Sequence, residues 1–441
     1  MSEIFYGFLN RQKIKMETLN FLYIETYGCS ANQNNSEILL GKLAESGLQL
    51  TENPEIADIL ILNTCIVKGP TENKMKGRII ELSKLDKPLV ITGCMPEVRK
   101  LGGKNVFLLG INHITEINKL IRRILENKYS EKEFLTQERE VKLNCSKINQ
   151  KKLIGITQIS EGCLGNCNFC ITKLAKKNLF SYPEEKILEN IKRDLEKGCR
   201  EIWITSQDNA AYGLDRDTNL IILLKKILSI DKKFKLRLGM MNPNNVLPIL
   251  DELIDCYKNE KMYKFLHIPV QSGSSKILKL MNRKYKIQDF IDIIKKFKKE
   301  IPDITIATDI ISAYPEETEE NHQENLNLLK KINPDVLNLT RFWAMPGTKA
   351  ACKKQIDSKI ARKRTLEIQK LHLKLAIEEN KKLEGKEIEV FVNEKSGTTY
   401  FSRTDNYKIV IVKIDKSILG KNIRVKIKQA FPHYFLGEIV R

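Results

Sequence analysis

The 441-residue sequence predicts an α/β protein with an N-terminal parallel α/β domain, a partial (β/α)6 barrel and a small C-terminal antiparallel β-barrel. Apolar strands and amphipathic helices alternate twice along the chain, which is typical of parallel sheets. One long helical pattern and five short strands with turn signals follow, as in small β-barrels. The expected domain bounds are residues 19–127, 150–381 and 382–441.

The composition is that of a globular protein with excess positive charge. No apolar run reaches the ~18 residues that a membrane span needs, and the N-terminus lacks the apolar segment of a signal peptide. We therefore expect a cytoplasmic protein whose ten cysteines serve clusters or metals rather than disulfides. The net charge of +20 favours a polyanionic partner such as nucleic acid, although a lysine-rich proteome gives the same charge without one.

The first alternation predicts four strands and three helices. The expected strands are 19–26, 57–63, 88–92 and 106–109, and the expected helices are 36–46, 71–84 and 114–125. Residues 1–18 are expected to form a polar, loosely held extension. Residues 127–150 are polar without helical periodicity, and we expect them to be a linker.

A cysteine follows each of the first three expected strands: Cys29, Cys65 and Cys94. Because the carboxyl ends of parallel strands lie at one edge of a sheet, we expect these thiols to meet there. Gly28 and Gly93 directly precede two of them and permit the sharp turns that this requires. The alternative is three separate buried thiols, since free cysteine is commonly an interior residue.

The second alternation predicts six β/α units and therefore an incomplete barrel with its site at the carboxyl ends of the strands. The expected strands are 154–160, 201–206, 234–240, 265–270, 304–311 and 336–342, and the clearest helical patterns are 183–197, 220–228 and 317–331.

Three cysteines at C-x₃-C-x₂-C spacing follow the first strand of this barrel: Cys163, Cys167 and Cys170. Three thiolates can hold three corners of an iron–sulfur cube and leave one iron open to a small molecule. A structural zinc site needs four ligands, and the nearest following histidine is His267. A zinc knuckle and chance spacing remain the alternatives.

The last part of the chain concentrates positive charge and aromatic residues. A helical pattern over 355–382 precedes expected strands at 387–393, 400–402, 408–413, 422–428 and 435–440. Residues 353–441 contain 21 Lys and Arg against 11 Asp and Glu. Basic groups bind phosphates and aromatic rings stack on unpaired bases, so this barrel is expected to bind RNA. Alternatively, some of the aromatic residues form its core: Tyr400, Phe401, Tyr407, Phe431, Tyr434 and Phe435.

The three-cysteine segment, with Phe169 before its last cysteine, resembles the radical S-adenosylmethionine (SAM) enzymes. Together with residues 27–29 (YGC), 63–65 (NTC), 92–94 (TGC) and 267–273 (HIPVQSG), it makes residues 20–441 similar to the methylthiotransferase family. The resemblance implies an auxiliary 4Fe–4S cluster on Cys29, Cys65 and Cys94, which supplies or carries sulfur. It also implies a catalytic 4Fe–4S cluster on Cys163, Cys167 and Cys170, which reduces SAM to a 5′-deoxyadenosyl radical.

Polar and small residues end the other strands of the barrel and are expected to converge on the catalytic cluster. Taken singly, each of them is more typical of a turn or a helix cap than of a ligand contact. In the light of the resemblance, the candidates for contact with SAM are Phe169, Thr205, Ser206, Gln207, Asp208, Gln271, Ser272 and Asp309.

Residues 171–173, 181–183 and 204–213 resemble the branch of the family that acts on N6-threonylcarbamoyladenosine beside the anticodon of tRNA. The expected product is the 2-methylthio derivative. The sequence departs from the family pattern at Lys176–Lys177, at Ser312–Ala313–Tyr314 and at Ala344–Met345. Methylthiolation of isopentenyladenosine or of a ribosomal protein, and a non-catalytic metal-containing RNA-binding protein, are the alternatives.

The resemblance also implies partners. We expect a monomer that binds the tRNA anticodon stem-loop, an electron donor of the flavodoxin or ferredoxin type and a sulfur donor, with no membrane partner.

Overall fold

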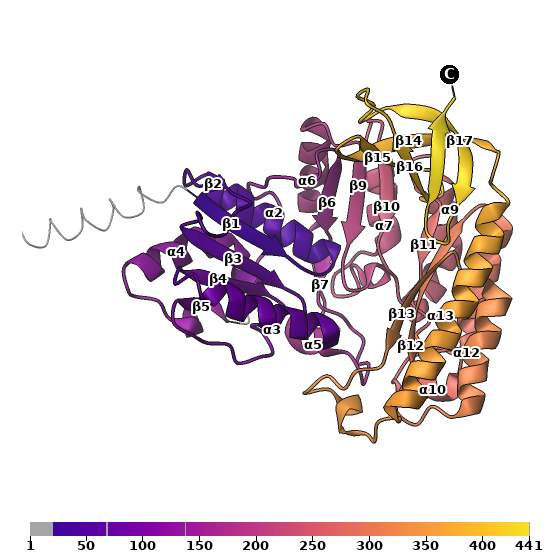
Figure 1. Ribbon diagram of the computed structural model, residues 1–441, viewed down its shortest axis with the longest axis horizontal. Helices are drawn as coiled ribbons and strands as arrows, with labels where there is room; N and C mark the ends of the chain where they lie inside the picture. The colour runs from indigo at the N-terminus through magenta and orange to yellow at the C-terminus, as the bar shows by residue number, and fades with distance from the viewer. Residues whose placement is uncertain (1–20, 68, 137, 441) are drawn as a thin grey trace, which may run out of the picture. The chain divides into compact units, whose positions relative to one another are not determined.

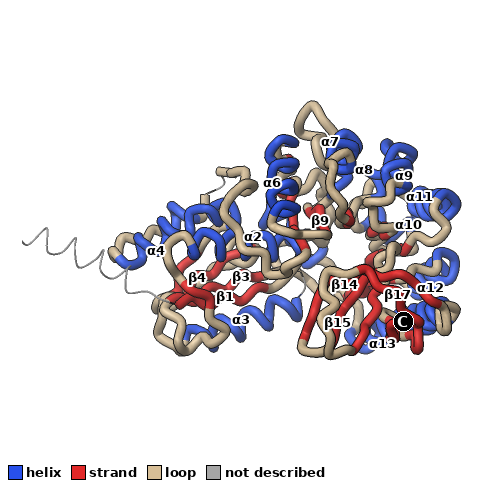
Figure 2. The backbone as a smooth tube through the Cα atoms, turned by 90° about the horizontal axis from the view of Figure 1, so that it is seen from above, coloured by secondary structure: helices blue, strands red, loops and turns tan. Residues whose placement is uncertain are grey.

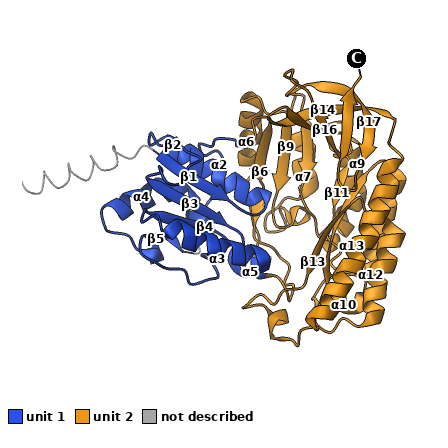
Figure 3. Cartoon of the chain, in the orientation of Figure 1, with its two compact units in different colours: residues 1–150, 171–177 blue, residues 151–170, 178–441 orange. Residues whose placement is uncertain are grey.

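The computed structural model describes residues 21–67, 69–136 and 138–440. The expected extension at residues 1–18 lies outside this part of the chain. The described residues form two compact units: those up to residue 150 together with 171–177 form one, and residues 151–170 together with 178–440 form the other (Figure 3). None of the described helices is long and apolar enough to cross a membrane.

The first unit is built on a five-stranded parallel sheet in the order β2-β1-β3-β4-β5 (Figure 1). Its strands are β1 (Phe21–Thr26), β2 (Gln49–Leu50), β3 (Ile59–Thr64), β4 (Leu89–Gly93) and β5 (Val106–Leu108), and its helices are α2 (Ser30–Ala44), α3 (Gly69–Ser83), α4 (Ile117–Leu125) and α5 (Ile171–Lys176).

Alternate residues of β3 point to opposite faces of this sheet, and both faces are covered. Ile61 packs with α2 and α4 on one face, whereas Leu60 and Leu62 pack with Leu82 of α3 on the other. A strand buried on both faces reads as a continuous apolar run, which is why the sequence predicted it.

Two expectations for this unit were wrong. Helix α2 begins at Ser30 instead of residue 36. The sequence did not reveal these first turns because their polar side chains are buried and show no amphipathic pattern. Residues 127–150 are not a free linker: Phe134 lies in the main core of the unit with none of its surface exposed, and Gly110 N–H donates to its carbonyl (2.7 Å). Leu143 is also buried, and Ile148 N–H donates to Glu37 O of α2 (3.0 Å), so several contacts anchor a segment that lacks helical or strand periodicity.

The second unit contains the expected six parallel strands in chain order. Strands β6 (Ile154–Gln158), β9 (Glu201–Thr205) and β10 (Lys235–Leu238) form one sheet, and β11 (Phe265–His267), β12 (Thr305–Ser312) and β13 (Val336–Arg341) form the next. A parallel bridge between Leu236 and Met262 joins the two sheets, so the strands form a partial barrel.

Helices lie outside this barrel (Figure 2). They are α6 (Glu184–Glu196), α7 (Leu220–Leu228), α8 (Pro243–Val246), α9 (Leu250–Lys258), α10 (Ser275–Leu280), α11 (Ile287–Glu300) and α12 (Glu319–Ile332). Two short strands, β7 (Ser160–Glu161) and β8 (Phe180–Ser181), pair with each other. In sequence, β7 precedes the three-cysteine loop and β8 follows it.

Helix α13 (Ser358–Lys381) leads into a closed five-stranded barrel in the order β14-β15-β16-β18-β17. Its strands are β14 (Glu387–Ser396), β15 (Thr399–Arg403), β16 (Ile409–Lys413), β17 (Asn422–Ala430) and β18 (Phe435–Ile439). The expected antiparallel pairing holds except between β16 and β18, which are parallel. A ring of five strands cannot alternate direction throughout, so closure requires a parallel pair.

This small barrel contacts the amino-terminal ends of the strands of the partial barrel. The buried carboxylate of Glu201, the first residue of β9, accepts hydrogen bonds from Trp203, Tyr263 (3.1 Å) and Asn393 of β14 (2.8 Å). Tyr407 packs on Tyr263, with ring centres 4.8 Å apart. The carboxyl ends of the same strands, where the cysteine loop begins, are therefore at the opposite end of the unit.

Candidate functional site: two sets of three cysteines

The first set, called here the strand-end cysteines, comprises Cys29, Cys65 and Cys94. They follow β1, β3 and β4, which are neighbours in the sheet. The pairing of β3 with β4 ends at Thr64 opposite Gly93, directly before Cys65 and Cys94. Cys94 N–H donates to Thr64 O at 3.1 Å. The topology thus delivers all three residues to one edge of the sheet, with Cys29 exposed and the other two buried.

Two glycines make these turns possible. Gly28 has φ +113° and Gly93 has φ +87°, a region that residues with a side chain rarely adopt. Space is also lacking. A Cβ on Gly93 would lie 2.3 Å from Thr64 O, and one on Gly28 would lie 3.2 Å from Cys65 Sγ. The Gly28 backbone therefore lies beside the Cys65 sulfur, which brings Cys29 and Cys65 together.

Asparagines brace the turns, a role that the sequence analysis did not assign to Asn32 or Asn63. Asn32, in the first turn of α2, donates to Tyr27 O (2.8 Å) and to Thr64 O (2.9 Å) and so ties the ends of β1 and β3 together. Asn63 donates to Asn32 O (2.7 Å) and Ser36 Oγ (2.8 Å). The sequence feature that could have indicated these asparagines is the polar run directly after Cys29, at residues 30–36.

The second set, called here the loop cysteines, comprises Cys163, Cys167 and Cys170 between β7 and α5. Gly165 N–H donates to Cys163 Sγ at 3.2 Å. A Cβ on Gly165 would lie 3.3 Å from Cys163 Sγ and 3.8 Å from Cys167 Sγ, so both sulfurs flank the same backbone position. Cys170 N–H donates to Cys167 O at 3.1 Å and closes the turn to the third cysteine.

Two side chains fix this loop to the barrel. Gly162 N–H donates to Gln207 Oε1 (2.7 Å), which attaches the start of the loop to the carboxyl end of β9. Asn168 donates through its backbone N–H to Met281 O (3.0 Å) and through its side chain to Leu280 O (2.8 Å). The loop is therefore held on both sides of Cys167.

The environment of Cys163 favours its neutral thiol in the absence of a metal. Burial and the neighbouring Asp208, followed by Cys170 and Cys167, raise the pKa of the Cys163 thiol to about 11, against the opposing effect of Gly165 N–H. Such a thiol is protonated at neutral pH, whereas a bound metal deprotonates a coordinating thiol. Among the described residues, no group of three His, Cys, Asp or Glu side chains is placed to hold a single metal ion. A 4Fe–4S cluster binds each thiolate at a different iron, so its three sulfur ligands can lie farther apart than the ligands of a single metal ion.

The polar residues at the end of β9 bond mainly to the protein itself. Ser206 Oγ accepts from Asp208 N–H (3.2 Å), as in a turn. The buried Asp208 carboxylate accepts from Asn242 N–H (3.0 Å) and from the Asn245 side chain (2.7 Å), and burial raises its pKa to about 6. Thr205 is buried at the end of the strand. These residues lie at the carboxyl end of β9, and their contact with SAM stays a prediction.

Three of the remaining candidates lie within β12 or after β11, and the fourth lies in the three-cysteine loop. Gln271 has φ +69° and bridges to β12 through its backbone, a strained conformation for a residue other than glycine. Ser272 is buried beside Asn325 of α12. Asp309 contacts His267 (3.0 Å) and accepts from Asn338 (2.6 Å). Phe169 packs edge-to-face on Tyr314. A role in binding SAM stays a prediction for all four.

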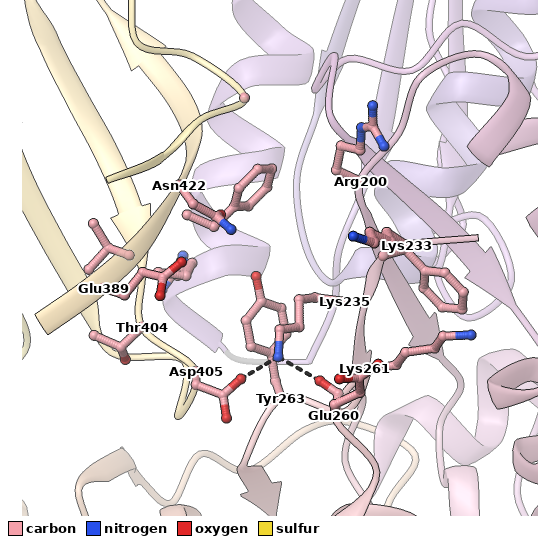
Figure 4. A pocket seen from close by; sticks show the side chains of 15 residues that line it. Arg200, Lys233, Lys235, Glu260, Lys261, Tyr263, Glu389, Thr404, Asp405 and Asn422 are labelled. Carbon is pink, nitrogen blue, oxygen red and sulfur yellow. Dashed lines mark hydrogen bonds and ion pairs between the residues drawn. The ribbon is translucent and has the colours of Figure 1, made fainter. Parts of the chain in front are cut away.

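Far from these residues, a cavity of about 690 Å³ lies where the two barrels of the second unit meet. Lys235 contacts Asp405 and donates to Glu260 O (2.6 Å) inside it, with Arg200 and Lys233 on the side of the partial barrel (Figure 4). It is lined by residues from the amino-terminal ends of the strands. Its position excludes it as the site of the cysteine chemistry.

Known protein families match three stretches of the chain: the uncharacterized protein family UPF0004 (residues 21–107), the radical SAM superfamily (157–329) and the TRAM domain (381–440). The probable threonylcarbamoyladenosine tRNA methylthiotransferase of Pyrococcus horikoshii is 38% identical over 424 residues, which are 95% of this chain and 99% of that protein. The chain belongs to the threonylcarbamoyladenosine tRNA methylthiotransferase family.

Other relatives support this assignment. The human threonylcarbamoyladenosine tRNA methylthiotransferase is 33% identical over 431 residues, covering 95% of this chain and 74% of the human protein. The solved structure of the radical SAM methyltransferase TsrM from Kitasatospora setae superposes with a TM-score of 0.55 at 12% identity, covering 75% of this chain and 76% of that one. This structural likeness shows a shared fold.

The family matches fall on the parts that the geometry singled out. The match to UPF0004 contains the strand-end cysteines, and the radical SAM match contains the loop cysteines. This methylthiotransferase is therefore a radical SAM enzyme, with a 4Fe–4S cluster and SAM as cofactors of that domain. The TRAM match coincides with the closed five-stranded barrel.

Proposed function

We propose that the protein converts N6-threonylcarbamoyladenosine beside the anticodon of tRNA into its 2-methylthio derivative. The observation that carries this proposal is the 33–39% identity, extending over about 95% of the chain, to relatives named for that substrate. Identity of this extent covers both cysteine sets and the C-terminal barrel together.

The loop cysteines would hold the 4Fe–4S cluster that works with SAM. Bound there, the cluster and SAM supply the one-electron chemistry that an unactivated C–H bond requires, which no side chain of the protein can supply. The chain's own contribution is to hold three sulfurs around one open position. Gln207 and Asn168 keep the loop at the carboxyl ends of the barrel strands, where SAM would bind beside Gln271 and Asp309.

The strand-end cysteines would hold a second 4Fe–4S cluster, and this cluster is the proposed source or carrier of the inserted sulfur. Three cysteines again leave one iron without a protein ligand, which sulfur could occupy. The convergence of β1, β3 and β4 and the braced turns at Gly28 and Gly93 support this assignment. A second SAM would provide the methyl group.

The closed C-terminal barrel would bind the anticodon stem-loop. Of the six aromatic candidates named from the sequence, Tyr400, Tyr407 and Phe435 are buried in cores, and the other three are left for stacking on bases. Phe431 and Tyr434 stack on each other, 4.5 Å between centres, in a partly exposed turn. We further propose a cytoplasmic monomer that takes electrons from a flavodoxin- or ferredoxin-type donor and sulfur from a separate donor.

Mass spectrometry of tRNA nucleosides from a deletion strain tests the reaction. The 2-methylthio derivative of N6-threonylcarbamoyladenosine should disappear and return with the wild-type gene but not with C167A or C65A. Purified C65A should still cleave SAM, whereas C167A should not. Loss of a methylthio group from isopentenyladenosine or from a ribosomal protein instead, or SAM cleavage by C167A, would contradict the proposal.

A further inference from the structure

Arg283 brings a positive charge to the loop cysteines. It lies between α10 and α11, far from the cysteines in sequence, and its guanidinium donates to Cys167 Sγ at 3.4 Å. The sequence analysis gave no reason to select it, because 116 residues separate the two partners.

The guanidinium is fixed in this orientation by other bonds. Its second terminal nitrogen donates to Asn242 Oδ1 (2.9 Å), and its Nε donates to the Tyr285 hydroxyl (3.2 Å). The Tyr285 hydroxyl donates in turn to Val270 O (2.6 Å). Arginine is always charged, and its planar fork can bond several acceptors at once.

A buried carboxylate completes this arrangement. Asn242 uses its backbone N–H to bond Asp208 and its side-chain oxygen to accept from Arg283. Asp208, Asn242, Arg283 and Cys167 thus form a continuous chain of hydrogen bonds from the end of β9 to the loop. Asp208 has both oxygens engaged in this way, so it orders Asn242 and Asn245 rather than pointing freely at a ligand.

We propose that Arg283 tunes the centre held by the loop cysteines by raising its reduction potential. Reduction adds an electron to the cluster, and a fixed cation and an N–H bond to a ligating sulfur stabilise the added negative charge. Arg283 is a positioning and tuning residue acting through Cys167. This inference rests on the proposed function in one respect, the assignment of a 4Fe–4S cluster to the loop cysteines.

The test is a redox titration, followed by electron paramagnetic resonance, of anaerobically reconstituted protein. Substituting Cys29, Cys65 and Cys94 by alanine in every sample leaves the loop-cysteine centre as the only signal. In this background we expect R283Q to lower the potential enough to reduce the ratio of reduced to oxidised cluster about tenfold at a fixed poise, or about 59 mV for one electron.

Lys284 provides the matched control, because K284Q removes the same charge from the neighbouring, exposed residue. Its potential should equal that of the parent. R283K keeps the charge but loses the fork, so we expect a smaller shift in the same direction. If R283Q fails to retain iron, the reduction potential measured for R283K tests the inference instead. A parent-like potential in R283Q, or in R283K where R283Q lacks iron, overturns the inference.

The outcomes also separate the inference from the proposed function. If the parent with only the loop cysteines takes up no 4Fe–4S cluster, the assignment of those cysteines fails before Arg283 is tested. If the cluster is present and its reduction potential is the same in the parent and in the Arg283 variants, only the inference about Arg283 fails.

Discussion

The strand-end cysteines and the loop cysteines provide the same number of sulfurs by different means. Cys29, Cys65 and Cys94 depend on a sheet: three neighbouring strands, two glycines with positive φ and two bracing asparagines. The loop cysteines come from one segment held by Gln207 and Asn168. The first set is therefore sensitive to the backbone of its whole domain, whereas the second set is sensitive mainly to the few contacts that anchor its loop.

The largest effect is expected from Gly93→Ala. The added Cβ would overlap Thr64 O, and alanine is strained at φ +87°. We expect a loss of more than about 3 kcal/mol in the free energy of unfolding of the first unit. Iron at the strand-end cysteines should be lost while SAM cleavage persists.

Urea unfolding and iron analysis check this prediction. Gly77→Ala is the control, because Gly77 lies within α3 with open space around its Cα, and alanine there should add about 1 kcal/mol. A G93A protein that retains wild-type stability and iron would show that the turns tolerate a side chain.

A smaller effect is expected from Gln207→Ala, which leaves Gly162 N–H without its acceptor. Loss of one such bond destabilises by about 1 kcal/mol. The loop should loosen, so iron at the loop cysteines should be lost faster to a chelator while the strand-end cluster is unaffected. Gln207→Glu keeps an acceptor oxygen and should restore retention. Equal chelation rates for all three proteins would contradict the anchoring role.

Gly165→Ala should have a smaller effect than Gly93→Ala. The added Cβ meets only side-chain sulfurs, at 3.3 and 3.8 Å, and the φ of Gly165 is not positive. The expected change in unfolding free energy is below about 1 kcal/mol. Thermal unfolding of the two variants side by side gives the comparison. A loss as large as that of G93A would show that the loop backbone is as constrained as the sheet turns.

Lowering the pH should change the stability of the first unit, through Glu72, differently from that of the second unit, through Asp208. Arg99 bonds both oxygens of Glu72 (2.9 and 3.1 Å) and holds the Glu72 pKa below 4.5, against the opposing effect of burial. This stability is present above pH 4.5 and is lost as the pH falls through the lower folded value. Burial raises the pKa of Asp208 to about 6, so its ionisation opposes folding more as the pH rises from 4 to 6.

Thermal unfolding of cluster-free protein below pH 4.5 measures the Glu72 contribution. The wild type should lose stability in the first unit, and E72Q, already less stable at pH 7, should lose less. Parallel pH profiles for the two proteins would exclude the Glu72–Arg99 pair as the source.

The sequence predicted most of the fold because the buried strands are apolar runs and the cysteines stand at their ends. Leu60 and Leu62, buried on one face of the sheet, and Ile61, buried on the other, made β3 recognisable. The anchors were harder to predict. Phe134, Asn32 and Arg283 act through contacts with residues distant in sequence, and no local periodicity marks them. The parallel β16–β18 pair follows from closure of an odd-numbered ring, which strand patterns alone do not show.

Iron and acid-labile sulfide analysis of anaerobically reconstituted protein tests the central claim most directly. The wild type should hold about eight irons and eight sulfides per chain. The C29A/C65A/C94A and C163A/C167A/C170A variants should each hold about four of both. Iron that stays at the wild-type level in either triple variant, or a colourless protein that holds only zinc, would contradict the account.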